Sequence, residues 1–488
     1  MPTGSTTGVL PAVIQGGMGV GVSGWRLARA VARTGQLGVV SGVALDAQLA
    51  RRLQLGDPDG DMRRALDHFP DQGTVTRIMD RYFVPGGIPT GRPFRPVPRL
   101  GLRPNRARDE LTVAGNFVEV WLAKEGHDGP VGVNYMEKIQ LATQPAAYGA
   151  MLAGVDHVLM GAGIPGELPG LLDALSTHST TELTVAVEGS QERHTVAFDP
   201  TGLAGPAPRN LFRPRFLAIV ASTVLARYLH RSSATRPDGF VLETHRAGGH
   251  SAPPRRREPL NDEGEPVYGP RDAIDIAKVA ALGPPFWLAG GQATPRGLAA
   301  AKDEGAAGVQ VGTVFALARE SGLTPGLRQG LLTRGAAGTL RVRNDPLASP
   351  TGFPFKVARV PDTLSDEEEF ALRPRLCDLG FLRTPFRKDN GTIGYRCPAE
   401  PVDAYVRKGG AKEDTDGRRC LCNALTANVG LQQHRPSGYV EPPLLTLGQD
   451  LDFLPDLLRH AGPDFSAADV VDYLLPKQET HARTSLVE

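Results

Sequence analysis

The sequence predicts an α/β protein, a (β/α)8 barrel (TIM barrel) with an inserted helical excursion and a mostly helical C-terminal extension. Eight short apolar runs, most of them followed by glycine and then by a helical segment, lead to this prediction. Short apolar runs are typical of strands buried on both faces, and strands that alternate with helices form parallel sheets. An open, doubly wound sheet of similar content is the alternative.

The expected strands and helices follow the chain in order. The strands are residues 12–15, 37–42, 131–136, 157–161, 216–220, 240–242, 286–291 and 308–313. The helices are residues 27–32 with Ser23 as N-cap, 145–153, 224–229 behind Ser222, 297–304 behind Thr294 and Pro295, and 314–320. Residues 184–188 and 194–198 suggest a small hairpin set into the repeat.

Two regions depart from the strand–helix rhythm, and they set the predicted domain boundaries. The barrel is expected to span residues 1–345. An excursion at 45–110 interrupts it and contains helical segments at 45–69 and 75–82. Its proline-rich part, 91–108, indicates an extended, solvated surface strip, or a docking strip for an acidic partner. That strip carries Arg92, Arg95, Arg99, Arg103, Arg106 and Arg108. Residues 346–488 form the extension, with helices expected at 449–460 and 467–475.

The composition excludes several classes of protein. A net charge of +1 gives no overall attraction to nucleic acid or to a membrane surface. No apolar run approaches the roughly 20 residues that span a bilayer, and residues 1–5 lack the features of a secretory signal. Only four cysteines occur in 488 residues, which favours a reducing compartment. We therefore expect a cytoplasmic protein.

The stretch from Gly239 to Ser251 has the pattern of a functional site. An apolar run, 240–242, is followed by Gly248, Gly249 and His250. The two glycines let a ligand approach the main chain, and the loop holds the histidine beside that gap. His245, upstream of the glycines, is expected to pack at the strand end. Glu243 is expected to contact a ligand or to form a salt bridge within the barrel mouth.

Other strands also end in glycine, at the positions where barrels bind phosphate. Phosphate commonly binds after the seventh and eighth strands of such barrels, which here end in Gly290, Gly291, Gly312 and Thr313. Glycine-rich ends on the first and sixth strands would let a flat ring lie against the backbone. The assembly therefore suits a phosphorylated planar cofactor.

Two rival patterns carry less weight. Residues 19–24 match the dinucleotide fingerprint Gly-x-Gly-x-x-Gly, but the acidic residue that should end the next strand is missing. The four cysteines, Cys377, Cys397, Cys420 and Cys422, all lie in the extension. Their spacing lacks the closely spaced pairs of a zinc site, so buried thiols are favoured and no metal is expected.

Taken together, the glycine motifs resemble those of the nitronate monooxygenase family (formerly 2-nitropropane dioxygenase), and they occur in the family's order. The matching runs are 14–19, 35–40, 132–134, 247–250, 290–291, 308–313 and 349–354. FMN-dependent enoyl reductases of fatty-acid and polyketide synthesis belong to the same superfamily. The resemblance spans about residues 10–320.

The resemblance implies that the barrel binds FMN. Gly17, Met18 and Gly19 would lie near the isoalloxazine, and Asn134 near the ring or ribityl chain. Gly290, Gly291, Gln310, Gly312 and Thr313 would hold the ribityl and phosphate end. His250 matches the family's active-site histidine, and the ordinary pKa of a histidine suits proton exchange near neutral pH.

The implied reaction is the oxidation of alkyl nitronates by O2 to carbonyl compounds and nitrite. The alternative is the reduction of an enoyl thioester with NAD(P)H, at the same site. The chain is longer than a minimal nitronate monooxygenase, and its size is closer to the polyketide-associated reductases. The arginine-rich strip could then meet an acyl carrier protein. A flavin-free binding barrel is a third, less favoured class.

Overall fold

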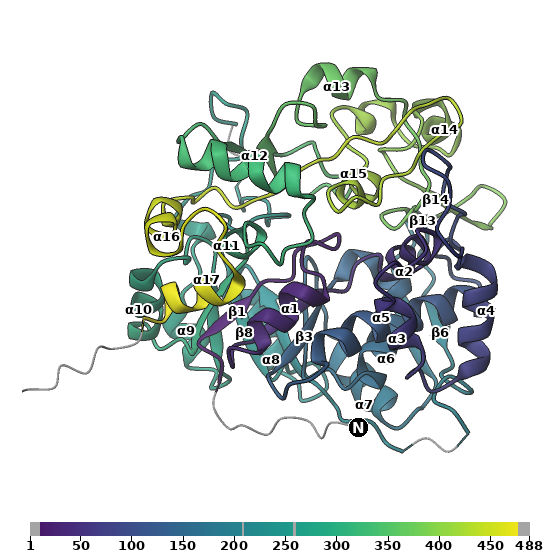
Figure 1. Ribbon diagram of the computed structural model, residues 1–488, viewed down its shortest axis with the longest axis horizontal. Helices are drawn as coiled ribbons and strands as arrows, with labels where there is room; N and C mark the ends of the chain where they lie inside the picture. The colour runs from purple at the N-terminus through teal and green to yellow at the C-terminus, as the bar shows by residue number, and fades with distance from the viewer. Residues whose placement is uncertain (1–9, 207–208, 257–259, 477–488) are drawn as a thin grey trace, which may run out of the picture.

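The computed structural model describes residues 10–206, 209–256 and 260–476, and a closed barrel of eight parallel strands lies at its centre (Figure 1). The first five residues, on which the expectation about a secretory signal rests, lie outside these ranges. The strands are β1 (Val13–Gln15), β2 (Gly38–Ser41), β3 (Val131–Met136), β4 (His157–Gly161), β7 (Arg215–Val220), β8 (Gly239–Glu243), β9 (Phe286–Ala289) and β10 (Gly308–Val311). All eight predicted strands are confirmed.

The strands pair around the barrel in chain order. The hydrogen-bonded order is β1-β10-β9-β8-β7-β4-β3-β2. Ile14 bridges Leu37 in parallel, and the Leu37 carbonyl accepts a 3.0 Å hydrogen bond from the backbone N–H of Gln15, so β1 and β2 close the ring. Closure rules out the doubly wound sheet. The predicted hairpin is found between β4 and β7, as β5 (Thr181–Val185) and β6 (His194–Phe198), with its first strand three residues earlier than the predicted 184–188.

Helices surround the barrel and connect its strands. They are α1 (Trp25–Ala32), α5 (Arg106–Lys124), α6 (Thr143–Leu152), α7 (Leu168–Ser176), α8 (Thr223–His230), α9 (Ile276–Ala280), α10 (Pro295–Asp303), α11 (Thr313–Ala316) and α12 (Pro325–Ala336), with 3-10 helices at η1 (Glu137–Ala142) and η2 (Pro270–Asp272). Ser222 and Thr294 cap α8 and α10 as predicted, each accepting a bond from the third residue on. In the described part of the chain, no helix is both long and apolar enough to cross a bilayer.

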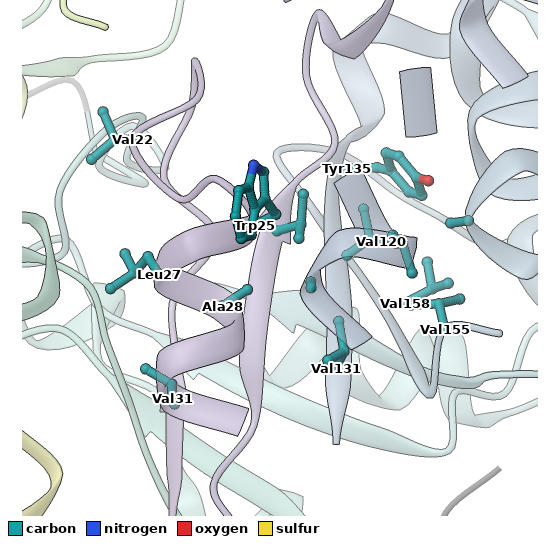
Figure 2. Packing of buried hydrophobic residues seen from close by; sticks show 14 of the residues in the cluster. Val22, Trp25, Leu27, Ala28, Val31, Val120, Val131, Tyr135, Val155 and Val158 are labelled. Carbon is teal, nitrogen blue, oxygen red and sulfur yellow. The ribbon is translucent and has the colours of Figure 1, made fainter. Parts of the chain in front are cut away.

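Strand side chains alternate between the barrel interior and the helix layer, as the pleat requires. The interior cluster includes Val39, Leu159, Val241 and Trp287, and all four are at most 1% exposed. The outward-facing residues pack against the helices in a larger cluster. Figure 2 shows part of it, with Leu27, Ala28 and Val31 on α1 and Val131 and Tyr135 on β3. Both layers together fix the strand ends, where the site forms.

The excursion differs from the prediction at two points. The single helix expected at 45–69 is broken into α2 (Leu45–Gln54) and α3 (Asp61–Leu66), because Gly56, Asp57 and Gly60 adopt positive φ. The helix expected at 75–82 is α4 (Gln72–Tyr82). The arginine-rich strip ends earlier than predicted, because the Asn105 side chain accepts from the Arg108 N–H and starts α5.

Ser23 is not the N-cap of α1. Its hydroxyl accepts a 2.9 Å hydrogen bond from the N–H of Met18 and donates to the Gly16 carbonyl at 3.0 Å. A carboxylate from α5, that of Glu119, instead accepts a 2.9 Å bond from the N–H of Trp25 at the start of α1. Since Glu119 lies far along the chain, local sequence could not reveal this cap. Ser23 therefore holds the glycine turn after β1.

Replacing Ser23 with alanine is expected to lower the free energy of unfolding by about 1–3 kcal/mol, because the part-buried Met18 N–H loses its acceptor, the hydroxyl of the fully buried Ser23. Urea unfolding measures the change. Ser222→Ala is the matched control, because it removes a cap outside the core at a cost of about 1 kcal/mol. A loss below about 0.5 kcal/mol for Ser23→Ala would contradict the assignment.

The chain after the barrel covers the C-terminal ends of the strands and then returns to the side of the barrel. Figure 1 shows α13 to α15 above the strands, and α16 and α17 beside the barrel next to α1, α10 and α11. The elements are β11 (Arg341–Asp345), β12 (Phe355–Arg359), α13 (Glu367–Leu372), β13 (Thr384–Arg387), β14 (Ile393–Arg396), α14 (Val402–Arg407), η3 (Lys412–Thr415), α15 (Leu421–Ala427), α16 (Phe453–Ala461) and α17 (Ala467–Leu474). The β11–β12 hairpin joins both sides of the boundary at residue 345, and the domain division stays a prediction.

Candidate active site at the barrel mouth

A cavity of about 570 Å³ opens at the C-terminal ends of the strands. It is large enough for a cofactor or a drug-sized ligand. Every residue of the predicted site lines it: Gly17, Met18, Gly19, Asn134, Gly248, Gly249, His250, Gly290, Gly291, Gln310, Gly312 and Thr313. Of the rival fingerprint 19–24, the cavity includes only Gly19 and Val20. What the assembled residues bind remains a prediction.

The floor of the cavity is the uppermost layer of inward-facing barrel residues. Most of its members lie two positions after an interior residue of the same strand, so the pleat points them inward as well. The floor consists of Gly16, Ser41, Asn134, Gly161, Ile219, Glu243, Ala289 and Gln310. Small or apolar residues fill most of the layer, and Asn134, Glu243 and Gln310 are its large polar members.

Two floor residues have side-chain oxygens with no bonding partner. Asn134 Oδ1 and Gln310 Oε1 are buried and accept no hydrogen bond within the described residues. Because a buried polar atom without a partner costs roughly 1–3 kcal/mol, such atoms point to a missing ligand. Both oxygens could accept bonds from N–H or O–H groups of a cofactor.

Bare backbone forms part of the wall. A Cβ on Gly17 would come within 2.4 Å of Asn134 Cβ, and a Cβ on Gly290 within 2.3 Å of Thr244 Oγ1. Gly290 also has φ +92°, a left-handed conformation that side chains disfavour. Glycine is thus required at both positions by the space available, and a flat ligand can lie against the main chain there.

His250 lines the cavity and is held from two sides. Its Nε2 lies 2.7 Å from Ser349 Oγ, and its ring meets Phe355 edge-on at 4.8 Å. Burial lowers the pKa of His250 to about 4, so the imidazole is neutral near pH 7. The sequence-based expectation of a pKa near neutrality is therefore wrong, because protein surrounds the ring.

The chain after the barrel contributes a strap, residues 446–450, that sequence reasoning missed. The N–H of Gly249 donates to Thr446 Oγ1 at 2.9 Å, and the N–H of Gly448 donates to Thr313 Oγ1 at 2.8 Å. A Cβ on Gly248 would come within 2.9 Å of the Gly448 nitrogen. No motif marks the strap, because it meets the glycine loop only through contacts across about 200 residues of chain.

The strap also changes the charge near the predicted phosphate position. Asp450 Oδ2 lies 2.4 Å from the place that a Cβ on Gly291 would occupy, and Asp450 forms an ion pair with Arg246. The carboxylate would repel a phosphate, and the guanidinium offsets that charge at the same rim. Lys138 is a further cation in the lining.

Glu243, which the sequence placed in the barrel mouth, interacts electrostatically with Lys356, a buried cation that the motifs did not identify. Burial raises the pKa of Glu243 to about 7, against the opposing charge of Lys356. Burial likewise lowers the pKa of Lys356 to about 8, and its Nζ has no hydrogen-bond partner among the described residues. The salt bridge considered for Glu243 is not found within that part of the chain. His245 stacks on Tyr268 at 4.0 Å, as its packing role predicted.

Apolar side chains of the C-terminal region form the opposite wall. Leu421, Leu425, Phe381 and Leu382 line the cavity and belong to a buried cluster that also contains Val20. Cys422 lines the same wall.

The cysteines are free thiols in a buried setting. Cys397 and Cys420 are buried and pack with Ala399 and the partly buried Cys422. Burial raises the pKa of all four thiols, which keeps them protonated near pH 7. In the described ranges, no three or more His, Cys, Asp or Glu side chains are grouped so as to hold a metal ion.

A family model described as nitronate monooxygenase matches residues 175–345. The predicted family resemblance is confirmed. The nitronate monooxygenase match includes the glycine loop before His250, the ends of β9 and β10, and His250 itself. It indicates an enzyme of the oxidoreductase kind. Comparison with curated proteins gives no match.

Several solved structures are similar to the chain at low identity. FabK from Thermotoga maritima is 17% identical, covering 96% of this chain and 92% of its own, with a TM-score of 0.46. Nitroalkane oxidase from Streptomyces ansochromogenes is 16% identical, covering 95% and 94%, with a TM-score of 0.46. The enoyl reductase domain of MlnA from Bacillus amyloliquefaciens is 11% identical, covering 73% and 65%, with a TM-score of 0.38. These likenesses are too distant to bear on substrate.

Proposed function

We propose that this protein is an FMN-dependent oxidoreductase that oxidises alkyl nitronates with O2 to carbonyl compounds and nitrite. The observation that carries the proposal is the position of the family match. It spans residues 175–345, and the site residues within that span converge on one cavity with the glycine turn after β1. Neither the match nor the cavity alone would indicate this chemistry.

The residues of the cavity fit FMN. The unpartnered oxygens of Asn134 and Gln310 can accept from the ring or the ribityl hydroxyls, and Gly17 leaves room for the ring against the backbone. Backbone N–H groups at Gly290, Gly291, Gly312 and Thr313 would hold the phosphate, with Arg246 balancing Asp450. When bound, FMN takes electrons from the substrate and passes them to O2.

His250 would bind the anionic substrate as a neutral hydrogen-bonding group. The hydroxyl of Ser349 at 2.7 Å fixes the ring, and Phe355 supports its edge. Lys138, with its Nζ 3.6 Å from Glu137 Oε2, is the remaining cation of the lining. The strap 446–450 holds the glycine loop beside the ring, because Thr446 Oγ1 accepts a bond from the Gly249 N–H. The chain thus supplies binding and orientation, and the cofactor supplies the redox step.

Enoyl-thioester reduction with NAD(P)H is the second candidate, and the apolar wall of the cavity favours it. Phe381, Leu382 and Leu421 could pack against an acyl chain. In this case the exposed Arg92, Arg95, Arg99, Arg103 and Arg106 could bind an acidic carrier protein, whereas Arg108 is buried. The test reverses the charges of Arg95, Arg99 and Arg103. If activity on carrier-bound substrate stayed unchanged, the carrier protein would be rejected as a partner of this strip.

Two assays on the purified protein separate the candidates. We expect aerobic turnover of propionate 3-nitronate with release of nitrite. Its rate should be at least about tenfold above the rate of NADPH oxidation with a crotonyl thioester. A tenfold difference in rate corresponds to about 1.4 kcal/mol in transition-state stabilisation. Rapid thioester reduction without nitrite would establish the alternative. Absence of both activities in protein that carries flavin would contradict both assignments.

A further inference from the structure

The apolar wall of the cavity comes from the chain after the barrel. Its residues are Phe381, Leu382, Leu421 and Leu425, which line the cavity and are at most 9% exposed. All four belong to one buried cluster of hydrophobic side chains. They lie beyond residue 345, where the family match ends. The wall is therefore a feature of this chain's own extension.

A helix and a turn form the wall, and they are joined to each other. Leu421 and Leu425 lie four residues apart on α15, so their side chains share one face of the helix. Between them, the thiol sulfur of Cys422 accepts hydrogen bonds from the backbone N–H groups of Phe381 and Leu382. These bonds tie the turn to the first turn of α15. The wall is thus a preformed surface, which a ligand can contact without ordering it first.

The wall continues to the catalytic end of the cavity. Phe355 belongs to the same cluster, and its ring meets the His250 ring edge-on at 4.8 Å. Met136 and Ile139, from β3 and η1, pack against the cluster and also line the cavity. A ligand whose reacting carbon lies beside His250 can therefore extend along an uninterrupted apolar surface.

The charged residues of the lining lie outside this cluster. They are Lys138, Glu243, Arg246 and Asp450. Because an unpaired charge on an apolar surface is strongly unfavourable, the wall disfavours a ligand with a charged far end. Burial of each methylene group is favourable by contrast. The chemistry that fits the wall is an uncharged hydrocarbon chain.

We infer that the extension makes the protein selective for substrates whose reacting carbon carries a long, uncharged alkyl chain, with Leu425 as a specificity-determining residue. The chain lies along the wall while the reacting carbon stays beside His250. The inference rests on the proposed function only for the position of the reacting carbon. An alkyl nitronate and an enoyl thioester would both place their hydrocarbon chain on this surface.

Calorimetric titration tests the inference without any turnover. The probes are the straight-chain carboxylates butanoate, hexanoate, octanoate and decanoate, whose planar anionic group stands in for a nitronate. Each is titrated into the flavin-loaded protein. We expect the dissociation constant to fall about fourfold per added methylene until the chain is longer than the wall. Equal dissociation constants across the series, or no binding of decanoate, would overturn the inference.

Replacing Leu425 with tryptophan should block part of the wall. We expect the preference for decanoate over butanoate to fall about tenfold or more, as when roughly two methylenes are no longer buried. Leu372→Trp is the matched control, because Leu372 is 79% exposed on α13 and does not line the cavity. Its preference should stay within twofold of wild type. A Leu425→Trp variant with the wild-type preference would overturn the inference.

Two further measurements keep the test decisive. FMN per chain is determined for each variant, and loss of FMN from Leu425→Trp would overturn the inference, because the wall would then hold the cofactor. Should Leu425→Trp fail to fold, Leu425→Ala replaces it. Alanine removes part of the apolar surface, so the gain in affinity per methylene should be smaller than in wild type. An undiminished gain would contradict the role of Leu425.

Turnover separates this inference from the proposed function. We expect kcat/KM for nitrite release to be at least about tenfold higher with hexyl nitronate than with ethyl nitronate. Equal values would overturn the inference and leave the proposed oxidation standing. Chain-length-dependent binding of the carboxylates without nitrite release from either nitronate would contradict the proposed oxidation and sustain the inference. NADPH oxidation should then be faster with an octenoyl than with a crotonyl thioester, and the reverse order would overturn the inference.

Discussion

Replacing His250 with asparagine is expected to lower kcat/KM for alkyl nitronates by about 10²-fold or more. The imidazole lines the cavity beside the glycine loop, and Ser349 and Phe355 fix its orientation. Asparagine is shorter and cannot reproduce the ring nitrogen that faces away from Ser349. Steady-state kinetics with nitrite detection measures the loss.

His245→Asn is the matched control for this variant. His245 lies on the same loop, but it stacks on Tyr268 and does not line the cavity. We expect its effect on kcat/KM to stay within a few-fold. Equal losses in both variants would mean that the loop as a whole, and not the His250 ring, is responsible.

Replacing Gly17 with alanine is expected to weaken FMN binding at least tenfold, which corresponds to about 1.4 kcal/mol. The new methyl group would stand 2.4 Å from Asn134 Cβ, so Asn134 or the turn after β1 must move. Either movement displaces the amide that is expected to bond the cofactor. Quenching of flavin fluorescence during titration of the apo-protein gives the dissociation constant.

Gly330→Ala is the matched control for the glycine variant. Gly330 lies within α12, and a Cβ there would meet no atom within 4 Å. We expect unchanged FMN affinity and a stability gain of up to about 1 kcal/mol, because alanine favours the helix. If Gly17→Ala bound FMN as tightly as Gly330→Ala, the ring could not lie against this turn.

The barrel was predictable because each of its strands can be recognised from its own short stretch of sequence. Runs such as 216–220 and 286–289 are apolar on both faces, as strands covered by helices must be, and glycine follows several of the runs, as at 290–291 and 312. The same glycines identified the part of the site that the strand ends supply. These features depend on neighbouring residues, so one sequence is sufficient to recognise them.

The parts that were missed depend on contacts between distant segments. Glu119 caps α1 from α5, and Ser349 holds His250 from beyond the barrel. Thr446 meets the glycine loop from a stretch without any motif. The lowered pKa of His250 is likewise a property of burial, which the residue type does not reveal. A lysine is ordinarily expected at the surface, yet Lys356 is fully buried.

Identifying the cofactor released from the purified protein tests the central claim most directly. The account predicts a yellow protein that releases one FMN per chain on denaturation, and a Gly17→Ala variant that retains less FMN per chain once unbound FMN has been removed from both. A wild-type protein that stays colourless after incubation with excess FMN, although correctly folded, would contradict it. The glycine-rimmed cavity would then serve another ligand.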